Sequence, residues 1–187
     1  MYKPKDYGQL LGHGVLSDEL LNTHFKLYEG YVNNTNQMLE LLDNIDPGTL
    51  EYSEIQRRFS WEWDGMRLHE LYFDNLTEEE KDFNINSELG KKINEIYGDF
   101  ETWRKNFLSV ASMRGIGWTI LYYDESSKEL FNVWINEHDG GHFVGCKPIL
   151  VIDCFEHAYF QDFGSKRPDY LEKIFSHIDW EKVTERF

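Results

Sequence analysis

The sequence predicts an α+β protein, with helices in its first half and a three-stranded antiparallel sheet flanked by helices in its second half. In the first half, apolar residues recur at steps of three and four, the period of an amphipathic helix. Later the pattern changes to short runs of β-branched and aromatic residues separated by turns, which is typical of strands. The 187 residues, 41% of them hydrophobic, suffice for one or two compact domains with a real core.

The first helix is expected from Ser17 to about Leu42. Ser17 is a suitable N-cap because its hydroxyl can accept a hydrogen bond from a free backbone N–H of the first turn. Asp18 and Glu19 add negative charge at the positive end of the helix dipole. The turn-forming cluster Asp46–Gly48 follows the helix. The positions that set the helical period are Leu20, Leu21, His24, Phe25, Tyr28, Tyr31, Val32, Met38, Leu39 and Leu42.

Two further helices are expected, one over about Trp61–Asn75 and one from near Ser87 to about Met113. The polar stretch Asn84–Asn86 between them is the candidate domain boundary. The sequence therefore predicts an N-terminal α-helical hairpin domain, residues 1–86, and a C-terminal α/β domain, residues 87–187.

Three strands are expected in the second half, over Ile116–Tyr123, Leu130–Ile135 and Ile149–Ile152. The short segment Asp124–Glu129 joins the first two as a hairpin turn. One helix should follow from about Phe155, and another should begin near Pro168, a residue that suits the first turn of a helix.

The net charge of −15 disfavours nucleic acid and anionic membranes as partners, and no apolar run approaches a membrane span. An enzyme of this charge that acts on an anion needs a local positive region near its site. Only two cysteines occur, Cys146 and Cys154, and no targeting segment is visible at the N-terminus, so a cytoplasmic location is expected. Cys154 is expected to be a buried, inert thiol, with a redox-sensing role as the alternative.

One segment combines a carboxylate and an imidazole at the end of an apolar run. Asp153 closes the third strand, and His157 follows four residues later, a spacing that can place both in one metal shell. Alone, this pattern also fits a helix N-cap and a surface histidine. His24 and His69 lie among large apolar residues and could equally be hydrogen-bonded core histidines. Together, three imidazoles and one carboxylate favour iron, manganese or zinc over an iron–sulfur cluster.

The chain resembles the iron/manganese superoxide dismutases over nearly its whole length, most strongly from Gly115 onward. Asp153–Tyr159 matches the D-x-x-E-H-A-Y signature of the family, and Arg167–Tyr170 matches its R-P-x-Y element. In the first half, Tyr31–Asn34 resembles the Y-V-N-N stretch that follows the first ligand. The resemblance implies superoxide dismutase activity with one Fe or Mn ion per subunit, bound by His24, His69, Asp153 and His157.

The resemblance also implies a side chain that hydrogen-bonds the metal-bound solvent, often glutamine in this family. Here His138 is the match, as in some archaeal-type members, and Gly65, four residues before His69, is expected to leave room for it. The alternative is that His138 is a solvent-exposed loop histidine.

The active-site tyrosine is usually eight residues after the first ligand, but Tyr31 is seven residues after His24. Seven residues make nearly two regular turns, so Tyr31 can still face the metal if the helix lacks the π-bulge that a spacing of eight requires. Tyr28, one turn from His24, is the competing candidate for this catalytic position.

The resemblance further implies a homodimer, with Glu156 bridging to the partner and Tyr159 contacting Tyr28 of the partner. Arg167 is the candidate for steering superoxide, with a surface ion pair as the alternative. Two other functions stay open: a catalytically silent structural or interaction protein, and a metal-dependent hydrolase or peroxidase using Glu70 or Glu137.

Overall fold

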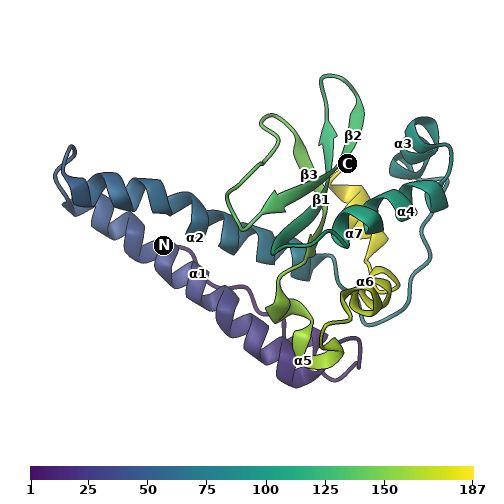
Figure 1. Cartoon of the computed structure of the whole chain (residues 1–187), viewed down its shortest axis with the longest axis horizontal. Coiled ribbons are helices and arrows are strands. Elements are labelled where there is room, and N and C mark those ends of the chain that lie inside the picture. Colours follow the sequence, from purple (N-terminus) through teal and green to yellow (C-terminus); the bar gives the residue numbers. More distant parts are fainter.

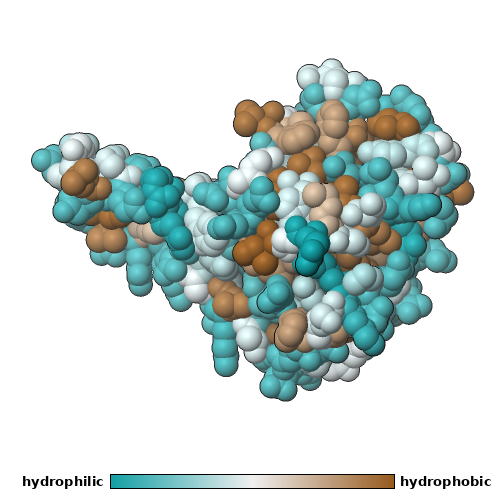
Figure 2. Space-filling view, viewed as in Figure 1, coloured by the Kyte–Doolittle hydropathy of each residue, from teal (hydrophilic) through white to brown (hydrophobic).

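The computed structural model describes residues 1–187. A short 3₁₀ turn, Gly8–Leu10, precedes two long antiparallel helices, α1 (Asp18–Asn44) and α2 (Leu50–Asp74). In Figure 1 the far end of this hairpin projects as an arm, and its other end packs against the rest of the chain. The face of the arm seen in Figure 2 is mostly hydrophilic, with a few isolated apolar residues.

Both long helices begin at side-chain caps. The Ser17 hydroxyl accepts a hydrogen bond from the Leu20 N–H at 3.1 Å, as predicted, and the Thr49 hydroxyl accepts one from Tyr52 at 3.2 Å. The prediction that the second helix starts near Trp61 was wrong by about three turns. The missed turns have no fully buried residue before Glu62, because this part lies in the arm and packs mainly against α1, so the apolar period is weak there.

The single helix predicted from Ser87 to Met113 is two helices, α3 (Glu88–Tyr97) and α4 (Phe100–Ala111). Gly98 ends α3 with φ at +89°, a left-handed conformation that glycine adopts without steric cost. Asp99 then caps α4, accepting a hydrogen bond from the Thr102 N–H at 2.6 Å. The sequence-based prediction missed this pair, in which Gly98 ends one helix and Asp99 caps the next.

The sheet consists of β1 (Gly117–Asp124), β2 (Glu129–Asn136) and β3 (Lys147–Asp153), all antiparallel, in the order β2-β1-β3. The predicted strands and hairpin turn are confirmed. The central strand β1 is buried along almost its whole length. Its register pairs Trp118 with Asp153, so an indole ring lies beside the carboxylate that ends β3.

After β3 the expected helix is replaced by a 3₁₀ turn, Glu156–Ala158, and a single helical turn, α5 (Phe160–Phe163). The non-helical φ of −146° at Tyr159 interrupts the helix between them. The helix predicted near Pro168 is confirmed as α6 (Arg167–Phe175), and α7 (Trp180–Glu185) follows. None of the helices is both long and apolar enough to span a lipid bilayer.

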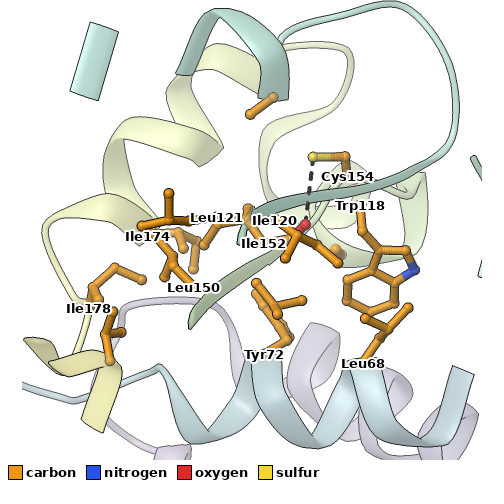
Figure 3. Packing of buried hydrophobic residues seen from close by; sticks show 14 of the residues in the cluster. Leu68, Tyr72, Trp118, Ile120, Leu121, Leu150, Ile152, Cys154, Ile174 and Ile178 are labelled. Carbon is orange, nitrogen blue, oxygen red and sulfur yellow. Dashed lines mark hydrogen bonds between the residues drawn. The ribbon is translucent and has the colours of Figure 1, made fainter. Parts of the chain in front are cut away.

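The main core lies between the sheet and α2. Figure 3 shows Leu68 and Tyr72 of α2 facing Trp118, Ile120 and Ile152 of the sheet. The expected burial of Cys154 is confirmed, and burial raises the pKa of its thiol to about 12, so the thiol is not poised for thiolate chemistry. Because residues from both halves share this core, side chains from both can converge on one site. The proposed division at residue 86 stays a prediction.

Candidate metal centre

Four predicted residues converge where the helical hairpin meets the end of β3. His24 comes from α1, His69 from α2, Asp153 from the end of β3 and His157 from the 3₁₀ turn, and one ligand atom of each lies within 4.8 Å of the others. The Nε2 atoms of His24 and His157 both lie 3.1 Å from the Asp153 Oδ2, and that of His69 lies 3.8 Å away. Three of the side chains are fully buried, and that of His157 is 22% exposed.

The hydrogen bond of His69 determines which of its nitrogens can bind an ion. Its Nδ1 donates to the Gly65 carbonyl at 2.6 Å, so the Nε2 of the neutral ring is an unprotonated acceptor. This Nε2 is buried and has no hydrogen-bond donor in the chain. An orphaned buried acceptor is costly, and a metal ion among the four residues would satisfy it. The site therefore fits a metal.

The charges of the cluster also suit a metal. Burial lowers the pKa of His24 and that of His69, so both imidazoles are neutral near pH 7. Burial alone would raise the pKa of Asp153, but the nearby imidazoles of His157 and His24, which hydrogen-bond to the carboxylate and are positively charged at the acid pH where it would titrate, outweigh burial and hold the pKa well below its usual range. Imidazole nitrogens with one carboxylate oxygen form a ligand set suited to iron, manganese or zinc.

The Asp153 carboxylate is held by its backbone surroundings. Its Oδ1 accepts the Phe155 N–H at 2.8 Å, which leaves Oδ2 facing the three histidines. The Asp153 carbonyl accepts the Tyr170 hydroxyl at 2.9 Å, and that hydroxyl also lies 3.0 Å from the hydroxyl of Tyr72 on α2. The sheet, α6 and α2 thus fix this ligand together.

His138 lies beside the cluster and is fully buried, so the alternative of a solvent-exposed loop histidine was wrong. Its Nδ1 is 3.0 Å from the indole Nε1 of Trp118, which can only donate, so the hydrogen of the neutral ring is on Nε2. That Nε2 is 2.7 Å from the Tyr31 hydroxyl. Burial lowers the pKa of His138 to about 4, so this arrangement holds at neutral pH.

The side chain that lies directly against Gly65 is Tyr31, and the expectation that this glycine leaves room for His138 stays a prediction. A Cβ at Gly65 would lie 2.6 Å from the Tyr31 Cδ1, far inside van der Waals contact. The Tyr31 ring stacks on His69, with ring centroids 5.1 Å apart, and meets the His138 ring edge-on at 4.8 Å. Helix α1 is α-helical throughout, without a π turn, as the seven-residue spacing requires.

Tyr28 points to a different network. Its hydroxyl donates to the Glu70 Oε1 at 3.1 Å and accepts the Lys5 N–H at 3.0 Å, with no hydrogen bond to the cluster or to His138. Of the two candidate tyrosines, the structure brings Tyr31 to His138. Tyr28 and Tyr159 are both largely buried within their own chain, and the predicted contact between them across a dimer stays a prediction.

The remaining predicted residues lie around this centre. Glu156 is exposed on the 3₁₀ turn next to His157. Arg167 forms no surface ion pair: its guanidinium donates to the backbone carbonyls of Met113 and Gly115, at 2.8 and 2.7 Å. Glu70 is engaged by Tyr28 and Arg67, so it is not a free base beside the cluster.

Two residues that contact His138 were missed. The indole of Trp118 fixes the His138 tautomer, and the Trp61 ring meets His138 edge-on, with centroids 4.7 Å apart. Pairing β1 with β3 in register would have placed Trp118 beside Asp153, so the sequence carried a signal for it. Trp61 lies eight residues, about two turns of α2, before His69 and four before Gly65, so helical spacing puts it on the same face as both and carried a signal for it as well.

Known proteins similar to this chain include members of one metal-binding enzyme family. Residues 85–186 match the family model described as iron/manganese superoxide dismutases, C-terminal domain. A relative from Haloferax volcanii, named a manganese superoxide dismutase, is 33% identical over 187 residues, which cover 98% of this chain and 92% of the relative. The chain belongs to the iron/manganese superoxide dismutase family.

Other family members of both metal types are similar to it. A protein of Aquifex pyrophilus named an iron superoxide dismutase is 34% identical, covering 99% of this chain and 90% of that protein. One of Sulfolobus acidocaldarius, also named an iron enzyme, is 31% identical, covering 91% and 85%. Relatives named for iron and relatives named for manganese thus have nearly the same sequence identity to this superoxide dismutase family member. Sequence identity therefore does not indicate which of the two metals it binds.

Proposed function

We propose that the protein is a superoxide dismutase that binds one iron or manganese ion per subunit through His24, His69, Asp153 and His157. The observation that carries this proposal is the convergence of these four side chains around a buried acceptor, the His69 Nε2, which no group of the chain satisfies. Membership of the family supports the reaction, the conversion of two superoxide ions and two protons into oxygen and hydrogen peroxide.

The chain divides the chemistry between the ion and its surroundings. A bound iron or manganese ion supplies one-electron oxidation and reduction of superoxide. Tyr31 and His138 hold protons beside it, because the His138 Nε2–H and the Tyr31 hydroxyl are hydrogen-bonded at 2.7 Å. Burial, with the charges of Asp153 and Glu62, raises the pKa of Tyr31 to about 12, so its phenol stays protonated near pH 7 and can donate a proton.

Tyr31 also reaches the surface. It borders a hollow of about 310 Å³ between α1 and α2, which Lys26 and Arg58 line with positive charge. Arg58 is paired with Glu62 at 3.0 Å, which leaves Lys26 as the cation without a carboxylate partner there. We propose this hollow as the approach for superoxide, and Arg167 as a second, more distant source of positive potential on a protein whose net charge is −15.

The assignment of the metal ligands is tested by replacing Asp153 and His69, one at a time. We expect Asp153→Asn and His69→Gln to lose stoichiometric metal, measured by elemental analysis of purified protein, together with superoxide dismutation. His13→Gln is the matched control, because His13 is a surface histidine paired with Glu78 at 2.7 Å. Full metal content in both ligand variants would refute the assignment.

Reconstitution with each metal separates the proposal from its rival. Metal-free protein loaded with iron or with manganese is assayed for superoxide dismutation, and activity with at least one of them is expected. A protein that binds either metal through the four residues but remains inactive would instead be the silent structural family member.

We further propose a cytoplasmic homodimer in which Glu156 of one subunit meets His157 of the other. The exposure of Glu156 and the 22% exposure of the His157 side chain support this contact. Sedimentation at micromolar concentration should give twice the chain mass of 22.4 kDa, and Glu156→Ala should shift the equilibrium toward monomer. A wild-type monomer under these conditions would contradict the dimer.

A further inference from the structure

His138 lies in a loop, not in a helix or strand. Its loop joins β2 to β3 and begins with Glu137, whose φ of +51° is unusual for a residue with a side chain. The loop closes on itself through a pair of backbone hydrogen bonds between Asn136 and Gly140, at 3.0 and 3.2 Å. A loop residue that must keep its imidazole within 3 Å of two partners needs further support.

His142 supplies a link between this loop and the sheet. Its Nε2 lies 2.7 Å from the backbone carbonyl of His138, and its Nδ1 lies 2.7 Å from the hydroxyl of Tyr122. Tyr122 belongs to β1, the central strand of the sheet, and its side chain is almost fully buried. The loop carbonyl is therefore connected through one imidazole to the buried central strand of the sheet.

The hydrogen bonds of His142 form a consistent set. A carbonyl oxygen only accepts, so the His142 Nε2 carries the hydrogen and its Nδ1 accepts the Tyr122 hydroxyl proton. Burial, with the charge of Asp64, raises the pKa of Tyr122, so the phenol stays a donor. The Asp64 carboxylate of α2 lies 3.7 Å from the same Nε2. Both ring nitrogens of His142 therefore have hydrogen-bond partners.

We propose that His142 is a positioning residue that, with Tyr122, sets the place of the His138 imidazole against Trp118 and Tyr31. Its effect on catalysis rests on the proposed function, because His138 acts there as a proton holder. Its effect on the geometry of His138 does not depend on any activity.

The test measures that geometry directly. The indole N–H of Trp118 donates to His138 at 3.0 Å, so its signal in the NMR spectrum of the full-length, ¹⁵N-tryptophan-labelled, metal-free chain reports this hydrogen bond. The indole of Trp103 donates to Asn132 at 3.1 Å on another part of the sheet and serves as an internal control. Trp118→Phe identifies the signal.

We expect His142→Leu to shift the Trp118 signal upfield while the Trp103 signal stays in place. His142→Gln should restore most of the Trp118 position, since its amide can donate to the carbonyl and accept from Tyr122. In the metal-loaded enzyme, kcat should fall about tenfold in His142→Leu and recover in His142→Gln, the size typical of losing an outer-shell partner.

Tyr122→Phe keeps the test decisive if His142→Leu does not fold. It removes only one hydroxyl and should move the Trp118 signal in the same direction by a smaller amount. An unmoved Trp118 signal in a folded His142→Leu or Tyr122→Phe protein would overturn the proposal, as would equal damage in the glutamine and leucine variants. If wild-type protein lacked activity with either metal but Trp118 responded as expected, the proposed function would fail and the positioning role would stand.

Discussion

At the scale of single residues, the chemistry of the centre depends on which nitrogen carries each proton. The Gly65 carbonyl directs the His69 Nε2 toward the cluster, and the Trp118 indole directs the His138 Nε2 toward Tyr31. Neither partner is a ligand. The sequence predicted the four converging residues and His138, but not the groups that orient His69 and His138: the Gly65 carbonyl belongs to the backbone, and the Trp118 indole becomes apparent only once β1 is paired with β3.

The buried, neutral state of His138 predicts acid sensitivity of the metal-free chain. Its pKa of about 4 in the folded protein lies below the ordinary value of 6.5, so the unfolded state takes up the proton first as the pH falls. The stabilisation is complete above about pH 6.5 and is lost progressively down to about pH 4. Between about pH 7 and about pH 5, this histidine should account for about 2 kcal/mol of lost stability.

Urea unfolding of the metal-free protein at the two pH values tests this expectation. His138→Gln does not titrate, so its loss of stability over the same interval should be smaller by that amount. An identical loss in both proteins would show that other groups account for the acid sensitivity.

At the scale of elements, the close approach of α1 and α2 depends on Gly65. Its missing side chain admits the Tyr31 ring, which in turn stacks on His69 and reaches His138. In the sequence, the glycine and the shortened spacing from His24 to Tyr31 are two separate signals. In the structure the two act together, because the regular seven-residue spacing turns Tyr31 toward α2, where its ring lies directly against Gly65.

Gly65→Ala should therefore displace Tyr31. The new Cβ would lie 2.6 Å from the ring, and the repacking should cost about 1–3 kcal/mol of stability and lengthen the hydrogen bond to His138. Gly30→Ala on α1 is the matched control, because nothing lies within 4 Å of its added Cβ. It should stabilise the chain by up to about 1 kcal/mol through helix propensity. Equal unfolding midpoints for the two variants would contradict the packing argument.

The boundaries of the elements show where sequence patterns lose information. The strands and the hairpin turn were predicted because β1 is buried on both faces and Asp124 begins a polar turn. The first three turns of α2 were missed because they pack mainly on α1 and bury no residue fully. An apolar period in the sequence locates a helix only where one face of that helix packs against a core.

At the scale of the whole molecule, the proposed ion would join parts that are distant in the sequence. His24 and His69 come from the helical hairpin, whereas Asp153 and His157 come from the sheet and the turn after it. An ion bound only by the folded state stabilises it by about 4 kcal/mol when its free concentration is about a thousand times its dissociation constant. For a chain of this size, that corresponds to a rise in Tm on the order of 10 °C.

Metal removal should therefore lower the Tm of the wild-type protein and of His13→Gln, but not that of Asp153→Asn. Hydrogen exchange should locate the effect. Amides of α1 around His24 should exchange faster without metal, because the ion no longer joins this helix to the end of β3, whereas the β1–β2 hairpin keeps its own ladder of hydrogen bonds. A uniform acceleration over the whole chain would mean that the ion stabilises one cooperative unit instead of joining two.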